Sequence, residues 1–331
     1  MELCAMHMKA QGQYLARSLS YRGTGFEIVR EDLPACFASL YDECVRLWGR
    51  IIAAVCRDYY AGETKADRLA KSQMWGANQR FWAQVCMAAK VAPTVRAARD
   101  AIRRGQCVVI GLQSTGETVA DGEPDGRSVE PSSSAAGILR AFIAKHCGKL
   151  PGELRDELLE DVAALRLPIN ALDELIHRLG GPESVAEMTG RKRRYVAVGG
   201  SWRYLPRAKA EGSIEAINVW ERRMFQSGRK LVAIISEASS TGISLHADRR
   251  ERNQRRRLHI VFQMPWSAEQ AIQQMGRSHR SNQVSAPEFR LVLSSIGGER
   301  RFTSAVASRL QSLGALTQGA RTFCPSIDEI C

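Results

Sequence analysis

The sequence predicts an α/β fold in which a mostly parallel sheet is covered by helices on both faces. Short, nearly continuous apolar runs occur at 107–112, 230–236 and 257–262, and such runs are typical of strands buried on both faces. A further strand is expected at 289–293. Segments with helical periodicity, such as 214–225, separate these strands. This alternation of strand and helix favours parallel pairing.

The composition is that of a globular protein with a basic surplus. The 331 residues are 44% hydrophobic and 25% charged, and at roughly 150 residues per domain they correspond to about two domains. No apolar run approaches the roughly 20 residues that span a bilayer, and the first residues lack the pattern of a signal peptide, so we expect no membrane association. The formal net charge of +12 suits a partner rich in phosphate.

The N-terminal third is expected to form a helical layer, residues 1–105, that packs on the rest. Apolar residues recur at helical spacing near 3–19 and, most clearly, over 34–60. A short strand is expected at 26–29. A second helical stretch around 74–87 is interrupted at Pro93 and continues to Arg104.

The main domain is expected to span 106–315, with an inserted subdomain at about 149–212 and a short tail at 316–331. The insertion begins with an acidic helical segment, 152–178, and continues into a basic stretch, 190–210. Tyr195, Trp202 and Tyr204 punctuate the basic stretch, either as stacking platforms for bases or as the core of a hairpin. A last helix is expected at 299–313.

The sharpest chemical signal is a group of polar residues in a predicted helix, 267–279. Gln273, Gly276, Arg277 and Arg280 stand at i, i+3, i+4 and i+7, which places them on one helical face. Arg277 and Arg280 would repel each other unless an anion lay between them, and paired guanidinium groups are suited to stabilising charge in phosphoryl transfer. The alternative is an ordinary solvated basic face.

The pattern Q-x-x-G-R-x-x-R at 273–280 resembles motif VI of superfamily 2 helicases. The segment KLVAIISEASSTGISL at 230–245 resembles motif V, and CVVIGLQSTGE at 107–117 resembles the opening strand and motif IV region of the second helicase lobe. Together with LGGPESVAEMTGRK at 179–192 and WSAEQAIQQMGRSHRSNQVSAPE at 266–288, these segments make nearly the whole chain similar to the Strawberry notch family.

The resemblance implies a RecA-like second lobe of a P-loop NTPase within a nuclear, ATP-dependent, helicase-like regulator of chromatin and transcription. Carried over by motif, Arg277 and Arg280 are the catalytic arginines that face the nucleotide. The predicted nucleotide-binding residues are Gln273, Gly276, Glu237, Thr241 and Gly242, and Ser239 of the motif V turn is predicted to contact nucleic acid. Many helicases end this turn with Gly-x-Asp, whereas this chain has Gly242-Ile243-Ser244, so the resemblance does not extend to an acidic contact there.

Two signatures of an ATP-binding first lobe are missing from the sequence. There is no G-x-x-x-x-G-K-[ST] to cradle phosphates, and the acid pair Asp173-Glu174 lies in a helical period rather than at the end of a strand. We therefore expect the first lobe to be absent and the chain, as a fragment or truncated product, to be inactive alone. ATP and Mg²⁺ would bind only together with that lobe, in a joint phosphoryl transfer.

Two arginine-rich segments are candidates for nucleic-acid contact. Residues 249–257, hereafter the arginine loop, carry six arginines and one acid, and they lie between motifs V and VI. The predicted phosphate contacts are Arg249, Arg250, Arg252, Arg255, Arg256 and Arg257, although such runs are also common on solvated surfaces. The second segment, 191–194, could serve as a nuclear localisation signal. The stretch 181–191 could form a turn and short helix of the helix-turn-helix type.

Three histidines near these motifs do not form a metal site, and no metal-ligating set is predicted. His259 lies in a predicted strand and is expected in the core, whereas His279 could face the nucleotide cleft. The nine cysteines contain no C-x-x-C pair, so reduced, mostly buried thiols are expected.

Two readings of the function remain open besides a helicase lobe. The chain could be a non-catalytic module that binds nucleic acid, with DNA more strongly expected than RNA. It could instead be a scaffold that recruits chromatin or transcription factors through the helical layer and the insertion. Salt dependence separates them, because phosphate contacts weaken with salt and an apolar interface hardly does.

Overall fold

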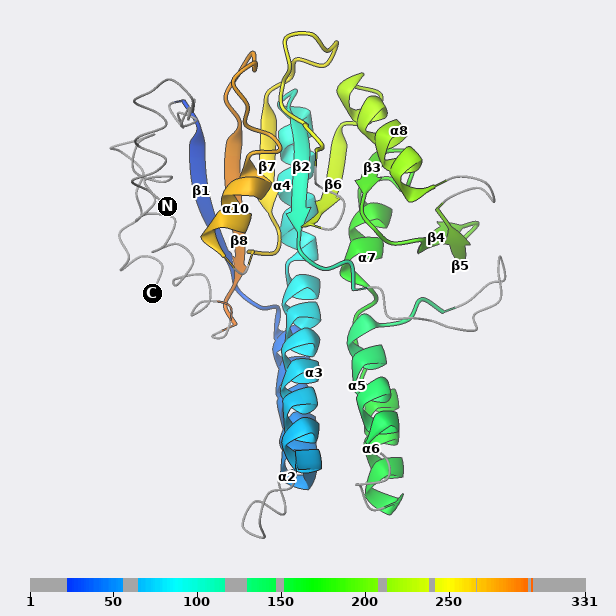
Figure 1. Ribbon diagram of the computed structural model, residues 1–331. Coiled ribbons are helices and arrows are strands. Elements are labelled where there is room, and N and C mark those ends of the chain that lie inside the picture. Colours follow the sequence, from blue (N-terminus) through cyan, green and yellow to red (C-terminus); the bar gives the residue numbers. More distant parts are fainter. Residues whose placement is uncertain are drawn as a thin grey trace, which may run out of the picture.

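The fold is built around a six-stranded sheet in which every neighbouring pair is parallel (Figure 1). The computed structural model describes residues 23–55, 65–116, 130–146, 152–207, 213–237, 242–265, 267–296 and 299. The strand order is β1-β8-β7-β2-β6-β3. In chain order these strands are β1 (Gly25–Glu31), β2 (Cys107–Leu112), β3 (Val185–Met188), β6 (Val232–Ser236), β7 (Arg257–Val261) and β8 (Glu288–Ser294). The predicted α/β class is confirmed.

The central strands are the apolar runs of the sequence, and every residue of β2, β6 and β7 is buried. The strand expected at 26–29 also exists as β1. It does not belong to a separate helical layer, because it pairs along its whole length with β8 and forms one edge of the sheet. None of its residues is fully buried, and Glu27 and Arg30 are exposed, which fits this edge position.

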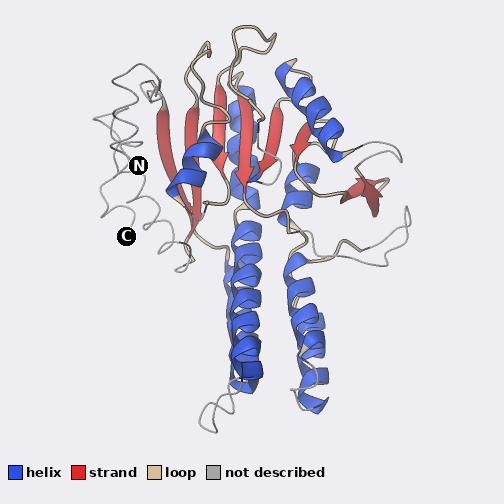
Figure 2. Ribbon diagram, in the orientation of Figure 1, coloured by secondary structure: helices blue, strands red, loops and turns tan. Residues whose placement is uncertain are grey.

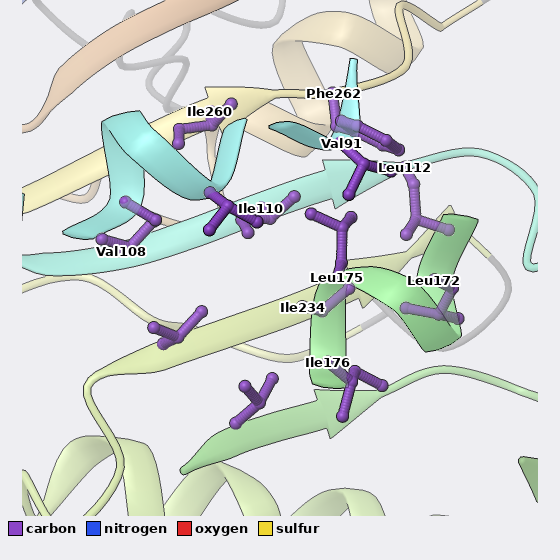
Figure 3. Packing of buried hydrophobic residues seen from close by; sticks show 14 of the residues in the cluster. Val91, Val108, Ile110, Leu112, Leu172, Leu175, Ile176, Ile234, Ile260 and Phe262 are labelled. Atoms are coloured by element: carbon purple, nitrogen blue, oxygen red, sulfur yellow. The ribbon is translucent and has the colours of Figure 1, made fainter. Parts of the chain in front are cut away.

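Helices cover both faces of the sheet (Figure 2). On one face, α4 (Val91–Arg103) and α7 (Ala171–Arg178) pack on β2, β6 and β7. Figure 3 shows this contact, with Val91 and Leu175 meeting Ile110, Ile234 and Phe262 in the apolar cluster of the sheet. On the other face lie α8 (Ile214–Gln226) and α10 (Ala268–Met275), each over its own smaller cluster.

Four long helices extend away from the carboxyl ends of the strands as a bundle (Figure 1). They are α2 (Ala35–Val55), α3 (Lys65–Ala89), α5 (Ser134–Lys145) and α6 (Gly152–Ala164). The bundle has its own apolar core, in which Trp48 meets Phe81 edge-on with ring centroids 5.6 Å apart. Arg50 of α2 pairs with Glu157 and Asp161 of α6. The N-terminal helices thus join helices from the C-terminal side of residue 105, so the structure does not divide at the expected boundary.

The helices α3 and α4 connect the bundle to the sheet almost without a break. The chain turns at Lys90, and Pro93 lies in the first turn of α4, where its missing N–H is tolerated. The predicted interruption near Pro93 is confirmed. The N-terminal third of the chain therefore contributes helices both to the bundle and to one face of the sheet.

The expected insertion at 149–212 is also shared between regions, because α6 joins the bundle while α7 and β3 belong to the sheet. Only the hairpin of β4 (Arg193–Val198) and β5 (Ser201–Pro206) stands apart. Its Tyr195 and Tyr204 rings lie 4.7 Å apart and both residues are buried. The hairpin-core alternative for these tyrosines is the one observed.

The short helix considered for 181–191 is wrong. Residues 185–188 form β3, whose four residues are buried and pair with β6. Glu187 interrupts the apolar pattern of this strand, and its charge is neutralised inside the protein by Arg191, whose Nε lies 2.6 Å from Glu187 Oε1.

Some predictions fall outside the described residues, namely the helices at 3–19 and 299–313 and the tail at 316–331. Of the helices that are described, none is long and apolar enough to cross a membrane. Four cysteines are described as free thiols: Cys44 and Cys107 are buried, Cys86 is partly buried and Cys36 is exposed.

Candidate functional site

A cleft of about 420 Å³ opens where the carboxyl edge of the sheet meets the bundle. The strands β2 and β6 end side by side there, with Leu112 and Ser236 in register. The cleft lies between the residues that follow these strands and the side of α3. Its lining consists of Gly76, Gln79, Arg80, Ala83, Gln84, Gln113, Ser114, Gly116, Ile138, Glu237 and Gln263.

The loop after β2 is held rigidly against this cleft. The backbone N–H groups of Gln113 and Ser114 both donate to Gln263 Oε1, at 2.9 and 3.0 Å. Gly116 has a φ of +64°, and a Cβ there would collide with the side chains of Gln84 and Asn170. Only glycine therefore fits this turn.

Asn170 ties this loop to two helices. Its Nδ2 donates to the Thr115 carbonyl and to Ser134 Oγ, both at 2.9 Å. Its Oδ1 caps α7 by accepting from the N–H of Leu172 at 2.8 Å. Ser134, in the first turn of α5, donates in turn to the Gly116 carbonyl at 2.5 Å. The loop is thereby fixed before any ligand binds.

Helix α10 packs on β7 and β8, reaches β2 through Gln274, and brings two predicted site residues together. Gly111 of β2 makes room for it, because a Cβ at that position would come within 2.5 Å of the Gln274 side chain. Gln270 Nε2 donates to Glu237 Oε1 at 2.7 Å. Gln273 and Glu237 then line a small hollow at the carboxyl edge together with Gln113, Ile235, Ser236, Gln270 and Gln274.

The helix predicted for 267–279 is too long, since α10 ends at Met275. The Arg277 carbonyl accepts from the Leu245 N–H at 2.7 Å instead of continuing the helix. Ser278 Oγ lies 2.7 Å from His259 Nδ1, which draws the chain down onto β7. Gly276, Arg277 and Arg280 therefore lie in a turn after α10, hereafter the helix-end turn (276–280), and not on one helical face with Gln273.

The helix-end turn leaves two arginines without carboxylate partners among the described residues. Arg277 is half-buried, and its Nε has no hydrogen-bond partner in the part of the chain that is described. Burial, and then the neighbouring positive charge of Arg280, lower the pKa of Arg277. Arg280 is exposed and donates from Nε only to the Gly276 carbonyl, at 2.8 Å. Two adjacent uncompensated cations favour an anionic ligand.

Of the remaining residues predicted to bind nucleotide or to belong to motif V, only some are described by the structure. Gly242 is exposed, with a φ of +78°, while Thr241 and Ser239 lie outside the described residues. His279 is buried with its Nδ1 bonded to Gln283, so it packs inward. His259 is a core residue, as expected, and burial lowers its pKa to about 3. No cluster of three metal-ligating side chains occurs within the described ranges.

The arginine loop lies at the opposite end of the sheet, where β7 begins (Figure 1). Arg249, Arg250, Arg252 and Arg255 are exposed. Arg250 pairs with Asp248 at 2.7 Å, which holds the pKa of that carboxyl well below its usual range. Arg252 and Arg255 have no side-chain partner among the residues described.

Two of the six arginines in the loop are committed to the fold. Arg256 pairs with Glu288 at 2.7 Å and also donates to the Ala286 carbonyl. Arg257 is only 1% exposed, so its predicted phosphate contact is wrong. Its guanidinium donates to buried acceptors, namely the carbonyls of Leu245, His246, Asn253 and Arg255 and the side chain of Gln226. An arginine whose guanidinium is buried in this way cannot contact the phosphates of a nucleic-acid strand.

The basic stretch around 191–194 is partly structural as well. Arg191 is buried and pairs with Asp173 at 2.7 Å and with Glu187 at 2.6 Å. Burial raises the pKa of Asp173 to about 6 against the opposing effect of Arg191. Arg193 lies over the Tyr204 ring at 4.6 Å. These contacts weaken the interpretation of the stretch as a localisation signal.

The α3 wall of the cleft was not predicted. Gly76, Gln79, Arg80, Ala83 and Gln84 recur every one to four residues along a helix that buries a separate apolar face in the bundle core. That small and polar stripe is the signal that could have located the wall. The sequence alone does not show which part of the protein this stripe faces.

Comparison with known proteins agrees with the expected family. A family model described as the C-terminal domain on Strawberry notch homologue matches residues 170–328. A second, described as P-loop containing NTP hydrolase pore-1, matches residues 1–43, a stretch without the G-x-x-x-x-G-K-[ST] signature. This second match lies in the segment that was expected to form a helical layer. It includes the edge strand β1.

Two relatives align with nearly the whole chain. Rat protein strawberry notch homolog 1 is 38% identical over 428 residues, covering 99% of this chain and 34% of the relative. Mouse protein strawberry notch homolog 2 is 39% identical over 431 residues, covering 99% of this chain and 32% of the relative. The chain thus spans about a third of the length of the curated relatives it matches.

Among solved structures, the C-terminal part of the Fun30 ATPase domain is 12% identical, with a TM-score of 0.38 over 86% of this chain and 89% of that chain. The fold assignment therefore rests on the strand order and helix layers described above. The family models and the relatives agree on one assignment. The chain belongs to the Strawberry notch family and carries its helicase-like C-terminal domain.

Proposed function

We propose that this chain is the second lobe of an ATP-dependent, helicase-like protein in which Arg277 and Arg280 contact the nucleotide phosphates. The observation that carries this proposal is the pair of adjacent guanidinium groups without carboxylate partners among the described residues. Guanidinium groups placed beside a transferring phosphoryl group stabilise the charge that develops on it. Gln273 and Glu237, together at the carboxyl edge, are placed to orient the remainder of the nucleotide.

The phosphate cradle and the Mg²⁺ ligands would come from a P-loop lobe. Mg²⁺ in such sites is held by a P-loop hydroxyl and a carboxylate that follows a strand. The single carboxylate in the hollow, Glu237, already accepts from Gln270, so the residues present do not form a magnesium site. In this proposal the chain supplies arginines to a nucleotide held elsewhere, and it hydrolyses no ATP alone.

A nucleic-acid role is the second part of the proposal. The net charge of +12 and the exposed Arg249, Arg252 and Arg255 support phosphate contact, with DNA preferred over RNA. Work on chromatin or transcription in the nucleus follows from the family resemblance. The missing P-loop signature favours, as the alternative, a nucleic-acid-binding or cofactor-recruiting module without catalysis.

The nucleotide proposal can be tested directly at the arginine side chains. In a ¹⁵N-arginine-labelled chain mixed with a P-loop lobe that holds the nucleotide, the Nε–H signals of Arg277 and Arg280, assigned with Arg277→Lys and Arg280→Lys, should shift on adding millimolar ATP. Adenosine, which lacks phosphates, should leave them unchanged. Shifts confined to other arginines would contradict the assignment, and ATP turnover that disappears in Arg277→Ala would overturn the prediction of inactivity.

The nucleic-acid proposal is tested by the salt dependence of binding. A labelled duplex and its single strand would be titrated by anisotropy between roughly 50 and 300 mM salt, with Arg252→Ala plus Arg255→Ala as the variant. On duplex DNA the slope of log K against log salt should fall by about 0.9 for each lost phosphate contact. An unchanged slope would remove the arginine loop from the interface.

A further inference from the structure

We propose that the cleft between α3 and the carboxyl edge binds one nucleotide of a single strand, with Gln79 and Arg80 of the bundle as its second wall. This inference rests on the nucleic-acid part of the proposed function. It adds a contact surface in the bundle, outside the helicase motifs. It also assigns the strand to the opposite end of the sheet from the arginine loop.

The size of the cleft fits a single unit of a strand. Its volume of about 420 Å³ lies in the range of roughly 300–1,000 Å³ that is usual for small-ligand sites. A duplex could not enter such a space. The unit must instead be presented by an unpaired strand that runs along the carboxyl edge.

The lining offers hydrogen bonds and one cation rather than stacking surfaces. Arg80 is exposed and has no carboxylate partner among the described residues, so its guanidinium is available for a phosphate. Gln113 and Glu237 line the cleft on the side opposite α3, and each side chain carries an acceptor oxygen. No aromatic ring is among the lining residues.

Acceptors of this kind recognise exocyclic amino groups. Glutamate accepts from the amino group of cytosine, and a glutamine amide can bond adenine in a bidentate manner. Thymine has no such amino group. The lining therefore predicts that strands of adenine or cytosine bind more tightly than strands of thymine.

The wall opposite α3 is already ordered, which reduces the entropic cost of binding. Gln263 fixes the two N–H groups of the loop after β2, and Asn170 fixes the Thr115 carbonyl. Gly116 keeps the backbone close to Gln84. These contacts hold in place the loop residues that line the cleft, namely Gln113, Ser114 and Gly116.

Removing the cation is the first test. Affinity for a labelled dA₁₂ strand should fall by about fivefold or more in Arg80→Ala, and Gln79→Glu should also weaken binding because it adds a negative charge. Arg68→Ala is the matched control: it removes an exposed arginine from the same helix, twelve residues and about 18 Å away. Arg68→Ala should change affinity by less than about twofold, and dT₁₂ should bind at least about fivefold more weakly than dA₁₂.

Photo-cross-linking locates the strand and separates the two proposals. A strand that carries 4-thiothymidine within adenines should cross-link to 76–84 or 113–116. Cross-links only to the arginine loop, with Arg80→Ala equal to Arg68→Ala, would overturn this inference and leave nucleic-acid binding standing. An absence of binding to any strand or duplex at about 50 mM salt would overturn the proposed function and this inference together.

Discussion

The arginine loop and the helix-end turn are both rich in arginine, but they use the guanidinium groups differently. In the loop, Arg257 and Arg256 donate to carbonyls and a carboxylate of the protein itself. In the turn, Arg277 and Arg280 have no carboxylate partner among the described residues. A guanidinium that the fold already satisfies stabilises the fold, whereas an unsatisfied one is available to a ligand. The density of positive charge along the sequence does not distinguish the two.

The largest expected effect is a loss of stability, and it tests whether Arg257 of the arginine loop stabilises the fold. Arg257→Ala should lower the free energy of unfolding by about 3–5 kcal/mol, because several buried carbonyl oxygens lose their donor. Urea titration measures this loss. Arg252→Ala, from the same loop but exposed, should change stability by less than about 0.5 kcal/mol. Equal effects of the two changes would show that Arg257 does not hold the loop.

Much of the sheet was predictable because burial on both faces leaves a clear mark. The run 107–112 was predicted as a strand and forms β2, since six consecutive apolar residues have few other solutions. In contrast, β3 was missed, because Glu187 interrupts its apolar pattern, although Arg191 and Arg194, four and seven residues further along, neutralise its charge. An apolar pattern does not show that the chain folds these arginines back onto a buried carboxylate.

The candidate site shows the same limit. Gln273 and Arg277 were found by spacing, but the early end of α10 depends on Leu245 and His259, which no helical periodicity reveals. The α3 wall of the cleft was missed for a related reason. Its polar stripe is visible in the sequence, whereas the loop that it faces is about thirty residues further along the chain.

A pH-dependent effect of intermediate size tests the anchor of the helix-end turn. His259 has an ordinary pKa of 6.5, and burial lowers it to about 3 in the folded chain. The unfolded state therefore binds more protons between these values, so stability is fully present above pH 6.5 and is lost as the pH falls. At 1.36 kcal/mol per pKa unit, the loss from pH 6.5 to about 5 is up to about 2 kcal/mol.

Urea midpoints at several pH values, for the parent and for His259→Gln, measure this contribution. The variant keeps a polar group beside Ser278 but does not titrate in this range, so its stability should fall less on acidification. His246, whose pKa is also lowered by burial, is present in both proteins and cancels in the difference. Parallel pH profiles would mean that His259 is not buried as a neutral ring beneath the turn.

The smallest expected effect on stability is also the most informative for function. Arg277→Ala removes a half-buried guanidinium that has no carboxylate partner among the described residues, so the unfolding free energy should change by less than about 0.5 kcal/mol. Thermal unfolding of the chain alone measures this, with Arg280→Ala as the exposed counterpart. A loss above about 2 kcal/mol would mean that the fold itself satisfies Arg277, as it does Arg257. The contrast between the helix-end turn and the arginine loop would then disappear, and with it the argument that this guanidinium awaits an anion.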